Sequence, residues 1–536
     1  MKSKNLYPII FLLPLILFIT AHYSSPFFNE KLTSSGFLTG EAPYYMANAR
    51  QYLDFGFDSI FYSNPFSDDL NSKRHYFQFQ TYILAVLLKL LPFSPGAIWN
   101  LFGLFFGFLF IKEAIKLIDS KIIENSQLPP LKYFFLLALF FFGGGVHVIA
   151  GIIHGLSQGD ISLISILKST DSLEIADGWW MHSVARNFLL PNYIFYYFLV
   201  FKILSHIDKN NSKSLFWQFV LAFSHPFVGV QTIFGICAWK VFEVFYFRSK
   251  LFSKKNLVIN IGILMTLFFY YMIFLNLDPE HKQQESQWKT TYDHLYKNWA
   301  MLGKNFIPSY LLVFIFFFLN ISPSKNFATF FKNPFYRFLA FLGVSNFFIA
   351  NHEFIISPIQ PIHFTQGMVW FPFALLSLVY FKDKINVKKI SYPMIVLFTL
   401  FFTLDNTVWY AKRIFQEFKG QNQQTHRLTK EETSIIAFLK ENFNDKKYLL
   451  VTANRQLSYH SSYQTSMSQW MAHKNITPRA YEKTLMLREF ITDQTVNDHW
   501  KDRETIFVTG KKVKLPIQDE VQISLATKNY NVWRLL

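Results

Sequence analysis

The chain begins with "MKSKNLYPIIFLLPLILFITAHYSS", residues 1–25, in which a short basic start precedes a long apolar run. A helix over this run is long enough to cross a hydrocarbon core of about 30 Å. The stretch has the form of a signal peptide, but no convincing small-residue cleavage site follows it. We therefore expect an uncleaved first span with its basic end in the cytoplasm.

The composition of the whole chain is that of a membrane protein. Of its 536 residues 51% are hydrophobic, 65 are Phe and only 16% are charged, which differs from an average soluble protein. The net charge of +17 comes mainly from Lys and Arg in short connections between apolar runs, so nucleic acid is not expected as a partner. Cys237 is the single cysteine, which leaves no disulfide framework and no cysteine-based metal site.

The apolar runs recur to residue 410 and predict a polytopic α-helical membrane protein with about 11–13 spans. After the first span the runs cover residues 77–91, 98–118, 133–153, 188–204, 215–223, 227–245, 257–274, 307–319, 335–349, 368–381 and 392–410. One of them, "LFWQFVLAFSHPF" at 215–227, is interrupted by His225 and Pro226. We expect it to form a half-helix or a re-entrant piece, since broken helices are tolerated where they line a protein cavity.

Basic connections predict the orientation of the chain. "FRSKLFSKKN", "SPSKNFATFFKNP" and "KDKINVKK" are rich in Lys and Arg, whereas "NHEFIISPIQPIHF" has neither. Because basic loops remain inside, the segments expected outside are 24–75, 278–304, 351–364 and everything after 410. We expect a multi-pass protein of a bacterial inner (cytoplasmic) membrane. Its transmembrane domain covers 1–411, including the outer loop at 24–75, and a small soluble extracytoplasmic domain covers 412–536.

The last 125 residues or so have the pattern of a small α/β domain. "TKEETSIIAFLKENF" places Thr429 as an N-cap with Glu432 three residues later, a capping box that leads an amphipathic helix. A second helix is expected around "PRAYEKTLMLREF", and strands at "YLLVT", "TIFVTG" and "NYNVWRLL". The chain has no Walker loop and no GxGxxG fingerprint, so we do not expect a nucleotide-driven pump.

The first outer loop contains "GEAPYYMANARQYLDFG", residues 40–56, in which Glu41 precedes two tyrosines and an amphipathic run. With one span before it, many spans after it and a soluble outer C-terminal domain, the layout resembles the GT-C superfamily of membrane glycosyltransferases. Members of that superfamily use polyprenyl-phosphate-linked sugars and typically carry a catalytic Asp or Glu in the first outer loop, often as an Asp-Glu pair. Here Gly40 occupies the position where many members have Asp.

The resemblance implies that Glu41 is the catalytic carboxylate. A carboxylate near the membrane face can accept the proton of an acceptor hydroxyl, while cationic or hydrogen-bonding groups stabilise the departing phosphate. Tyr44 and Tyr45 follow it as candidate substrate-binding residues. The alternative is that Glu41 only favours the N-terminus of the helix, as acids do.

Four further polar side chains and one cation are candidate substrate-binding groups. Arg186 begins an apolar run and either binds a phosphate with its guanidinium or extends to the lipid headgroups. His225, His352, Glu353 and His363 interrupt apolar sequence, where ionisable groups are costly and often functional. His363, next to an aromatic residue, is also typical of an interfacial aromatic belt.

The cofactor is not fixed by the sequence. Histidines beside a carboxylate could bind a divalent cation, although no HExxH or Asp-x-Asp spacing is present. No cofactor is certain and the metal site is unknown. A divalent cation remains a candidate.

The leading hypothesis is an integral-membrane glycosyltransferase that moves a sugar from a polyprenyl-phosphate donor to a glycan, lipid or protein acceptor on the extracytoplasmic face, in contact with membrane lipids. One alternative is a transporter or flippase of a lipid-linked intermediate, although transporters usually show repeats and charged residues within spans. Another is a non-catalytic envelope assembly protein.

Overall fold

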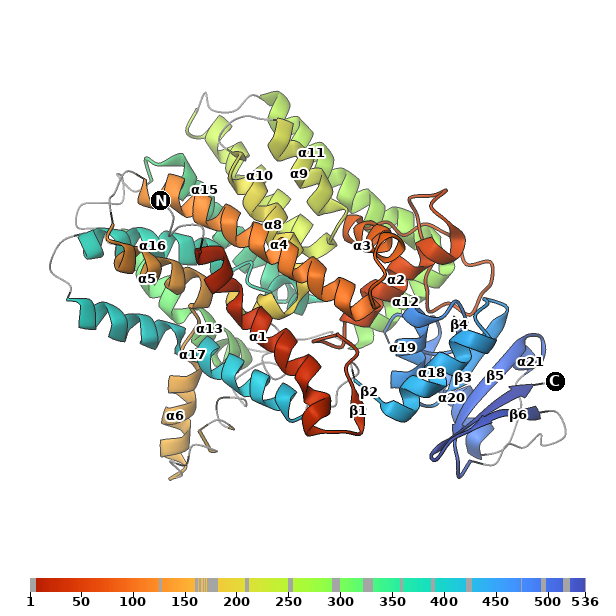
Figure 1. Ribbon diagram of the computed structural model, residues 1–536. Helices are drawn as coiled ribbons and strands as arrows, with labels where there is room; N and C mark the ends of the chain where they lie inside the picture. The colour runs from red at the N-terminus through yellow and green to blue at the C-terminus, as the bar shows by residue number, and fades with distance from the viewer. Residues whose placement is uncertain are drawn as a thin grey trace. The chain divides into compact units, whose positions relative to one another are not determined.

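The computed structural model describes residues 6–124, 128–159, 162, 165–166, 168, 170, 182–207, 212–248, 254–291, 299–321, 331–356, 360–386, 391–420, 427–473, 475–492, 498–513 and 521–535. Helices make up nearly all of the chain before residue 418, and a small mixed sheet with its helices follows (Figure 1). The fold class expected from the sequence is confirmed. Parts of all three basic connections that predict the orientation lie outside the described residues.

The helices of the first 418 residues follow the apolar runs closely. They are α1 (Tyr7–Phe28), α2 (Ala42–Phe55), α3 (Phe79–Leu90), α4 (Pro95–Ile118), η2 (Asp119–Ile123), α5 (Pro130–Phe142), α6 (His147–Ser157), η4 (Ala185–Leu189), α8 (Pro191–Leu204), α9 (Ser212–Ala222), α10 (Pro226–Phe245), α11 (Lys254–Phe268), η6 (Phe269–Phe274), η7 (Leu275–Leu277), α12 (Pro279–Thr291), α13 (Trp299–Ile321), α15 (Pro334–Ala350), η8 (His352–Phe354), η9 (Pro361–Phe364), α16 (Trp370–Asn386) and α17 (Tyr392–Phe418).

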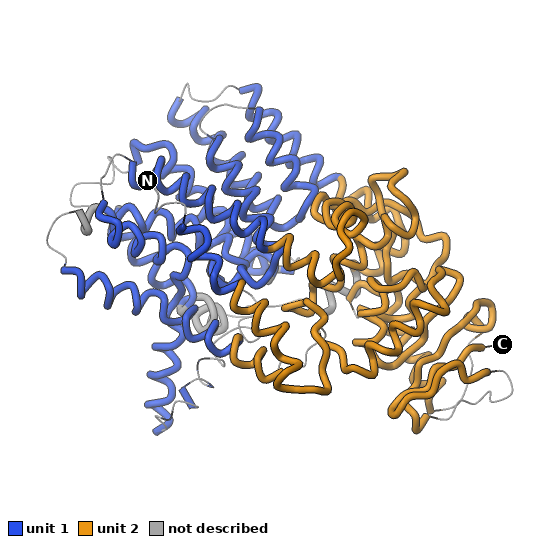
Figure 2. The backbone as a smooth tube through the Cα atoms, viewed as in Figure 1, with its two compact units in different colours: residues 1–15, 104–269, 292–413 blue, residues 16–103, 270–291, 414–536 orange. Residues whose placement is uncertain are grey.

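The chain forms two compact units, shown in different colours in Figure 2. Unit 1 comprises residues 1–15, 104–269 and 292–413, and unit 2 comprises 16–103, 270–291 and 414–536. Unit 2 therefore combines the first polar loop with the C-terminal segment. The sequence predicts a boundary at 411/412 between a membrane domain and a soluble domain. The two compact units are defined by internal packing and not by contact with lipid, so this boundary stays a prediction.

Four helical stretches among the described residues are long and apolar enough to cross a membrane: α1, α10, α17 and Lys254–Leu277, which joins α11, η6 and η7. The pair α5 and α6 adds a fifth if it is one broken span. Several other predicted spans are shorter helices, such as α3 with 12 residues, about 18 Å at 1.5 Å per residue, whereas α4 has 24 residues. The interrupted run at 215–227 forms the 11-residue α9 and then α10, with His225 as the N-cap of α10.

The apolar run predicted over 133–153 does not form one continuous helix, because the helix breaks within it. α5 ends at Phe142, α6 begins at His147, and the two are bent by 68°. Gly143, Gly144 and Gly145 lie in the break, and three consecutive glycines make the helix entropically unfavourable there. The break was visible in the sequence as this triple glycine.

The C-terminal segment forms a five-stranded sheet in the order β4-β3-β5-β7-β6. The strands are β3 (Tyr448–Thr452), β4 (Ser468–Gln469), β5 (Glu504–Gly510), β6 (Val521–Ala526) and β7 (Tyr530–Leu535). β3 is parallel to β4 and β5, whereas β7 is antiparallel to β5 and β6. The helices are α18 (Lys430–Asn442), α19 (Arg455–Gln464), α20 (Ala480–Thr492) and the short α21 (Asp498–Lys501).

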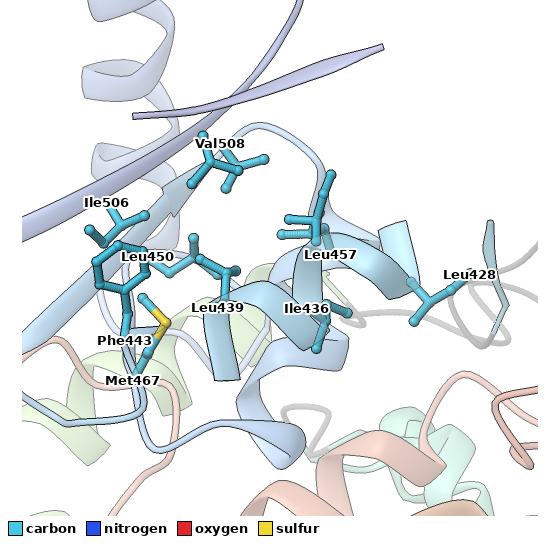
Figure 3. Packing of buried hydrophobic residues seen from close by; sticks show 11 residues of the cluster. Leu428, Ile436, Leu439, Phe443, Leu450, Leu457, Met467, Ile506 and Val508 are labelled. Carbon is cyan, nitrogen blue, oxygen red and sulfur yellow. The ribbon is translucent and has the colours of Figure 1, made fainter. Parts of the chain in front are cut away.

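Each face of this sheet buries its own apolar cluster. On one face α18 contributes Ile435, Ile436 and Leu439, which pack with Leu450 of β3 and Ile506 of β5 (Figure 3). The other face packs against α20 and α21. The capping box predicted at the start of α18 is confirmed: Thr429 Oγ1 accepts from Glu432 N and Glu432 Oε2 accepts from Thr429 N.

A second, two-stranded sheet joins the first polar loop to the C-terminal segment within unit 2. β1 (Leu32–Thr33) pairs antiparallel with β2 (Leu428–Thr429), with Leu32 opposite Thr429. The Thr33 hydroxyl adds a hydrogen bond to Leu428 O at 3.0 Å. Two segments about 400 residues apart in sequence are therefore fixed side by side, and both lie on the same side of any membrane.

Candidate functional site

Glu41 is positioned by a tight approach of two chain segments just before α2. Gly36 has φ of +84°, and a Cβ there would lie 2.7 Å from Gly96 Cα. Only glycine fits this position without displacing the backbone. Glu41 is then the N-cap of α2, and Pro43 lies in the first turn, where proline needs no N–H acceptor.

The side chain of Glu41 does not cap the helix it precedes. Its backbone is helical, with φ of −85° and ψ of −22°, and its carboxylate makes no capping hydrogen bond. Capping residues usually have extended backbones and accept from the second or third helical N–H. The alternative of a side-chain cap at Glu41 is therefore not supported, although the proximity of its charge to a helix N-terminus remains.

Burial raises the pKa of Glu41 to about 7. Desolvation disfavours the ionised form of a carboxyl group. A base whose pKa lies near the operating pH is suited to proton transfer. Glu41 is thus the kind of perturbed carboxyl group that often marks a functional site.

Aromatic side chains from both ends of the sequence surround the start of α2. Tyr44 N donates to the hydroxyl of Tyr459 at 3.1 Å, and the ring of Tyr44 stacks on Phe66 with centroids 6.1 Å apart. His473 contacts this group, with its ring 5.5 Å from that of Tyr459. After burial, the charge of Glu41 further raises the pKa of both tyrosines, which places Glu41 within electrostatic reach of their hydroxyl groups.

The two predicted substrate-binding tyrosines have different surroundings. Tyr44 is partly exposed, and Asn48 follows it one turn later in α2. Tyr45 is buried and stacks on Trp99 at 5.6 Å between centroids. Tyr44 is therefore available to a ligand, whereas Tyr45 packs the helix onto α4.

Sequence reasoning missed Tyr459, Phe66 and His473. Tyr459 lies on α19 and His473 follows β4, more than 400 residues after Glu41. Such long-range contacts leave no local periodicity in one sequence, so no signal was available for them.

Arg186 lies in a buried polar centre of unit 1. It is 3% exposed, its Nε donates to Asn406 Oδ1 at 3.0 Å, and its guanidinium lies 5.3 Å from the ring centroid of Trp409. This is not the geometry of an arginine that extends to lipid headgroups. Asn406 also donates to Phe142 O and Gly143 O, which satisfies carbonyls freed by the break after α5.

Asp405, to which the sequence analysis gave no part, completes this centre. Its two carboxylate oxygens accept from the backbone N–H groups of His147 and Val148, each at 2.8 Å, and so cap the N-terminus of α6. His147 also contacts Asp405 through Nδ1 at 3.2 Å and Ser309 Oγ through Nε2 at 3.2 Å. An acid buried in a span is thereby paired and hydrogen-bonded, as low-dielectric surroundings require.

Three of the predicted histidines form a connected aromatic group in unit 1. His363 stacks on Phe227 with centroids 4.7 Å apart, and His352 meets Phe364 edge to face at 5.4 Å. His225 Nδ1 accepts from Val228 N at 3.3 Å, and its ring lies 5.6 Å from that of Phe227.

Burial lowers the pKa of His363 to about 4. This imidazole is therefore neutral near pH 7 and can bind a ligand by hydrogen bonding rather than by charge. Glu353 lies beside His352 on the short helix η8 and is partly buried.

Glu41 belongs to unit 2, whereas Arg186, His225, His352, Glu353 and His363 belong to unit 1. The structure brings the three histidines together and holds Arg186 in its own polar centre. The expectation that Glu41 and these side chains act on one substrate stays a prediction. Among the described residues no group of three His, Cys, Asp or Glu side chains could hold a metal ion.

No protein-family model and no curated protein matches this chain. Among solved structures it is similar to ArnT from Cupriavidus metallidurans bound to undecaprenyl phosphate, with 9% identity over 98% of both chains and a TM-score of 0.49. It is also similar to the oligosaccharyltransferase AglB from Archaeoglobus fulgidus in complex with an inhibitory peptide and a dolichol-phosphate, with 13% identity over 95% of this chain and 70% of that one and a TM-score of 0.42. Matches at this level concern the fold alone, so the assignment of function depends on the residues of this chain.

Proposed function

We propose that this protein is an integral-membrane glycosyltransferase of the GT-C type, which transfers a sugar from a polyprenyl-phosphate donor to an acceptor on the extracytoplasmic face. The observation that carries the proposal is Glu41: a carboxyl group with a pKa raised to about 7 by burial, without a capping hydrogen bond, at the position that the sequence resemblance assigns to the catalytic acid.

Glu41 is the general base in this proposal. Its carboxylate takes the proton of the acceptor hydroxyl as that oxygen bonds to the anomeric carbon of the donor sugar. The bond between the anomeric carbon and the phosphate oxygen breaks, and its electron pair leaves with the polyprenyl phosphate. Tyr44 and Tyr459, whose hydroxyl groups lie within electrostatic reach of Glu41, supply hydrogen-bonding groups for the sugar or the acceptor.

Arg186 is the proposed ligand of the lipid phosphate. A guanidinium can bind two phosphate oxygens at once, and its burial strengthens such an interaction by lowering the local dielectric. The neutral side chains Asn406 and Trp409 hold it in place.

The test is sugar transfer by the purified protein, given a radiolabelled polyprenyl-phosphate sugar and an acceptor extract. Glu41→Gln keeps the size of the side chain but removes the proton acceptor, so turnover should fall by about 10²- to 10⁴-fold while donor binding persists. Arg186→Ala should instead weaken donor binding, since a charge-assisted contact is lost.

Wild-type turnover in Glu41→Gln would remove Glu41 from the mechanism. The transporter alternative predicts that even the wild-type protein transfers no sugar but moves the labelled lipid across vesicle membranes.

A further inference from the structure

Unit 2 contains a polar cavity of about 380 Å³ that the proposed transfer reaction does not use. It is lined by Asp68, Asp69, Leu70, Asn71, Arg479, His499 and Arg503. Its volume lies within the range of about 300–1,000 Å³ that is usual for small-molecule sites. Four of these residues come from the first polar loop and three from the C-terminal domain, so the cavity exists only where the two segments meet.

The base of the cavity is a fixed ion pair. Lys483 Nζ donates to Asp68 Oδ1 at 2.6 Å, and both side chains are at least 96% buried. Burial opposes ionisation of Asp68, but the pairing with Lys483 outweighs it and holds the pKa of Asp68 below its ordinary value. The charges of this pair cancel, and removing either partner would leave the other buried and unpaired.

Arg503 is held rigidly in the wall. It donates to the carbonyl of Asp68 at 2.5 Å, to the carbonyl of Lys446 at 2.8 Å and to Ser468 Oγ at 3.0 Å. Each of these acceptors is neutral, so the hydrogen bonds orient the guanidinium without neutralising it, while the charges of Asp68 and Asp69 act on it through space. A cation ordered in advance binds an anion with less entropic cost.

The mouth of the cavity carries exposed charge. Arg479 is 47% exposed and His499 is 42% exposed, at 3.8 Å and 3.1 Å from Asp68 Oδ2. Arg479 has φ of +52°, in the left-handed region that non-glycine residues seldom adopt. Residues with strained backbone angles of this kind are often found at ligand-binding sites.

The lining selects the chemistry of the ligand. Arg479 and Arg503 balance Asp68 and Asp69 in formal charge, and Lys483 is opposed by Asp68 and by Glu280. Because Asp68 is buried in its ion pair, the two guanidinium groups share the lining with one exposed carboxylate, Asp69, which favours an anionic group beside them. Asp69 and Asn71 offer oxygen acceptors beside the guanidinium donors, a mixture that suits hydroxyl groups, each of which donates and accepts. Leu70 is the single apolar residue of the lining, so a prenyl chain does not fit.

We propose that this cavity binds an anionic saccharide, a sugar unit that carries a phosphate or carboxylate group. That this saccharide is part of the acceptor rests on the proposed function. The binding itself does not, because the cavity involves neither Glu41 nor Arg186.

Isothermal titration of the purified full chain in detergent tests the proposal without donor or turnover. The probes are glucose 6-phosphate, galacturonate, glucose and inorganic phosphate. We expect the two anionic sugars to bind at least about tenfold more tightly than glucose or inorganic phosphate, because a charge-assisted contact adds to the hydroxyl contacts.

Three variants distinguish the cavity from other sites. Arg479→Gln should weaken both anionic sugars by about tenfold or more and leave glucose unchanged. Asp69→Asn should strengthen them, since it removes a like charge at the mouth. Arg488→Gln changes an exposed arginine of α20, the helix that begins directly after Arg479, and should alter the binding of neither anionic sugar.

Unchanged binding in Arg479→Gln, or the absence of anionic-sugar binding by the wild-type protein, would overturn the proposal. Inorganic phosphate that binds as tightly as glucose 6-phosphate would also overturn it, as evidence of an unspecific anion site. If Arg479→Gln fails to fold, Asp69→Asn still tests the proposal, because it should strengthen the binding of both anionic sugars. A protein that transfers sugar but binds no anionic saccharide refutes this inference alone, and one that binds without transferring refutes the proposed function alone.

Discussion

Two opposing effects act on the carboxyl group of Glu41. A helix N-terminus stabilises a negative charge by about 0.3–1 kcal/mol, which would lower its pKa. Burial has the opposite effect and is larger, since it raises the pKa to about 7 from an ordinary value near 4.3. The raised pKa of Glu41 is therefore a result of its burial in the fold.

The first consequence is a pH dependence of sugar transfer. Because the ionised form of Glu41 is the base, turnover at saturating donor should rise tenfold per pH unit below about pH 7 and level off above it. If the base were an exposed glutamate with an ordinary pKa, turnover would rise with pH only up to about pH 4. The measurement is turnover between pH 5 and 9, with circular dichroism at each pH as a control for unfolding. A profile flat from pH 5 to 9 would contradict the role of Glu41.

The second consequence concerns stability. A carboxyl group whose pKa is higher in the folded than in the unfolded chain destabilises the fold as pH rises from about 4 to above 7. Glu41→Gln should therefore stabilise the protein by about 1–3 kcal/mol at pH 8 and by nearly nothing at pH 4. Thermal unfolding in detergent at both pH values measures this difference. A structural glutamate would give the reverse, a loss of stability on substitution.

Glu41 was predictable at the residue scale, but its surroundings were not. An acid before two tyrosines in a polar loop can be read from a dozen consecutive residues. The burial that raises its pKa exists only in the folded chain, in which Tyr459 and Phe66 pack around the start of α2. Asp405 was overlooked for a similar reason, because its partners are backbone N–H groups of a helix more than 250 residues earlier.

At the scale of elements, the break between α5 and α6 is the main departure from the expected pattern. Hydropathy alone predicts one span, since both halves are apolar. The triple glycine weakens the helix, and Asp405 and Asn406 satisfy the backbone groups that the break leaves unpaired. Broken helices inside a membrane need such partners. The break between α5 and α6 is therefore stabilised by the polar side chains of α17, and these buried side chains in turn find their hydrogen-bond partners at the break.

A glycine-to-alanine pair tests this dependence. A Cβ at Gly143 would lie 2.1 Å from Leu139 O and 2.6 Å from the Phe402 ring, so Gly143→Ala should cost about 1–3 kcal/mol through overpacking. Gly262, in α11, has no atom within 4 Å of a Cβ, so Gly262→Ala should be neutral or stabilise by up to about 1 kcal/mol. Thermal unfolding of both variants is the measurement. Equal effects would show that the break is not held by packing at Gly143.

Elements with strong local signals were predicted well. The capping box at Thr429 and the apolar spacing behind it define α18, and the strands at 448–452 and 504–510 alternate or run apolar as buried strands do. β4, with two residues, and the exposed β6 carry too little pattern to be recognised. α19 was also missed, because its sequence "RQLSYHSSYQ" is polar although most of it is buried.

At the scale of the whole molecule, unit 2 explains why the first polar loop is long. The loop supplies Glu41, one strand of the β1-β2 sheet and the ion-pair partner of Lys483, and each of these uses the C-terminal domain. The loop and the C-terminal domain therefore fold as one body, and a truncation after residue 411 would remove the lysine that pairs with Asp68. Within this unit, the two segments that surround the proposed base, the first polar loop and the C-terminal domain, also form the walls of the proposed saccharide cavity, through different residues.

The membrane topology gives the last prediction. Because β1 pairs with β2, the loop and the C-terminal domain share one side, and the basic start of the chain predicts that this side is outside. Single cysteines at two exposed positions, Asn71→Cys and Lys501→Cys, should both react with a membrane-impermeant thiol reagent in intact cells, whereas Lys254→Cys should react only after lysis. The native Cys237 is buried, so labelling of the unsubstituted protein gives the background signal. Reaction of only one of the first two would refute the shared side. Reaction of Lys254→Cys alone would keep the shared side but place it in the cytoplasm, which would exclude transfer on the extracytoplasmic face.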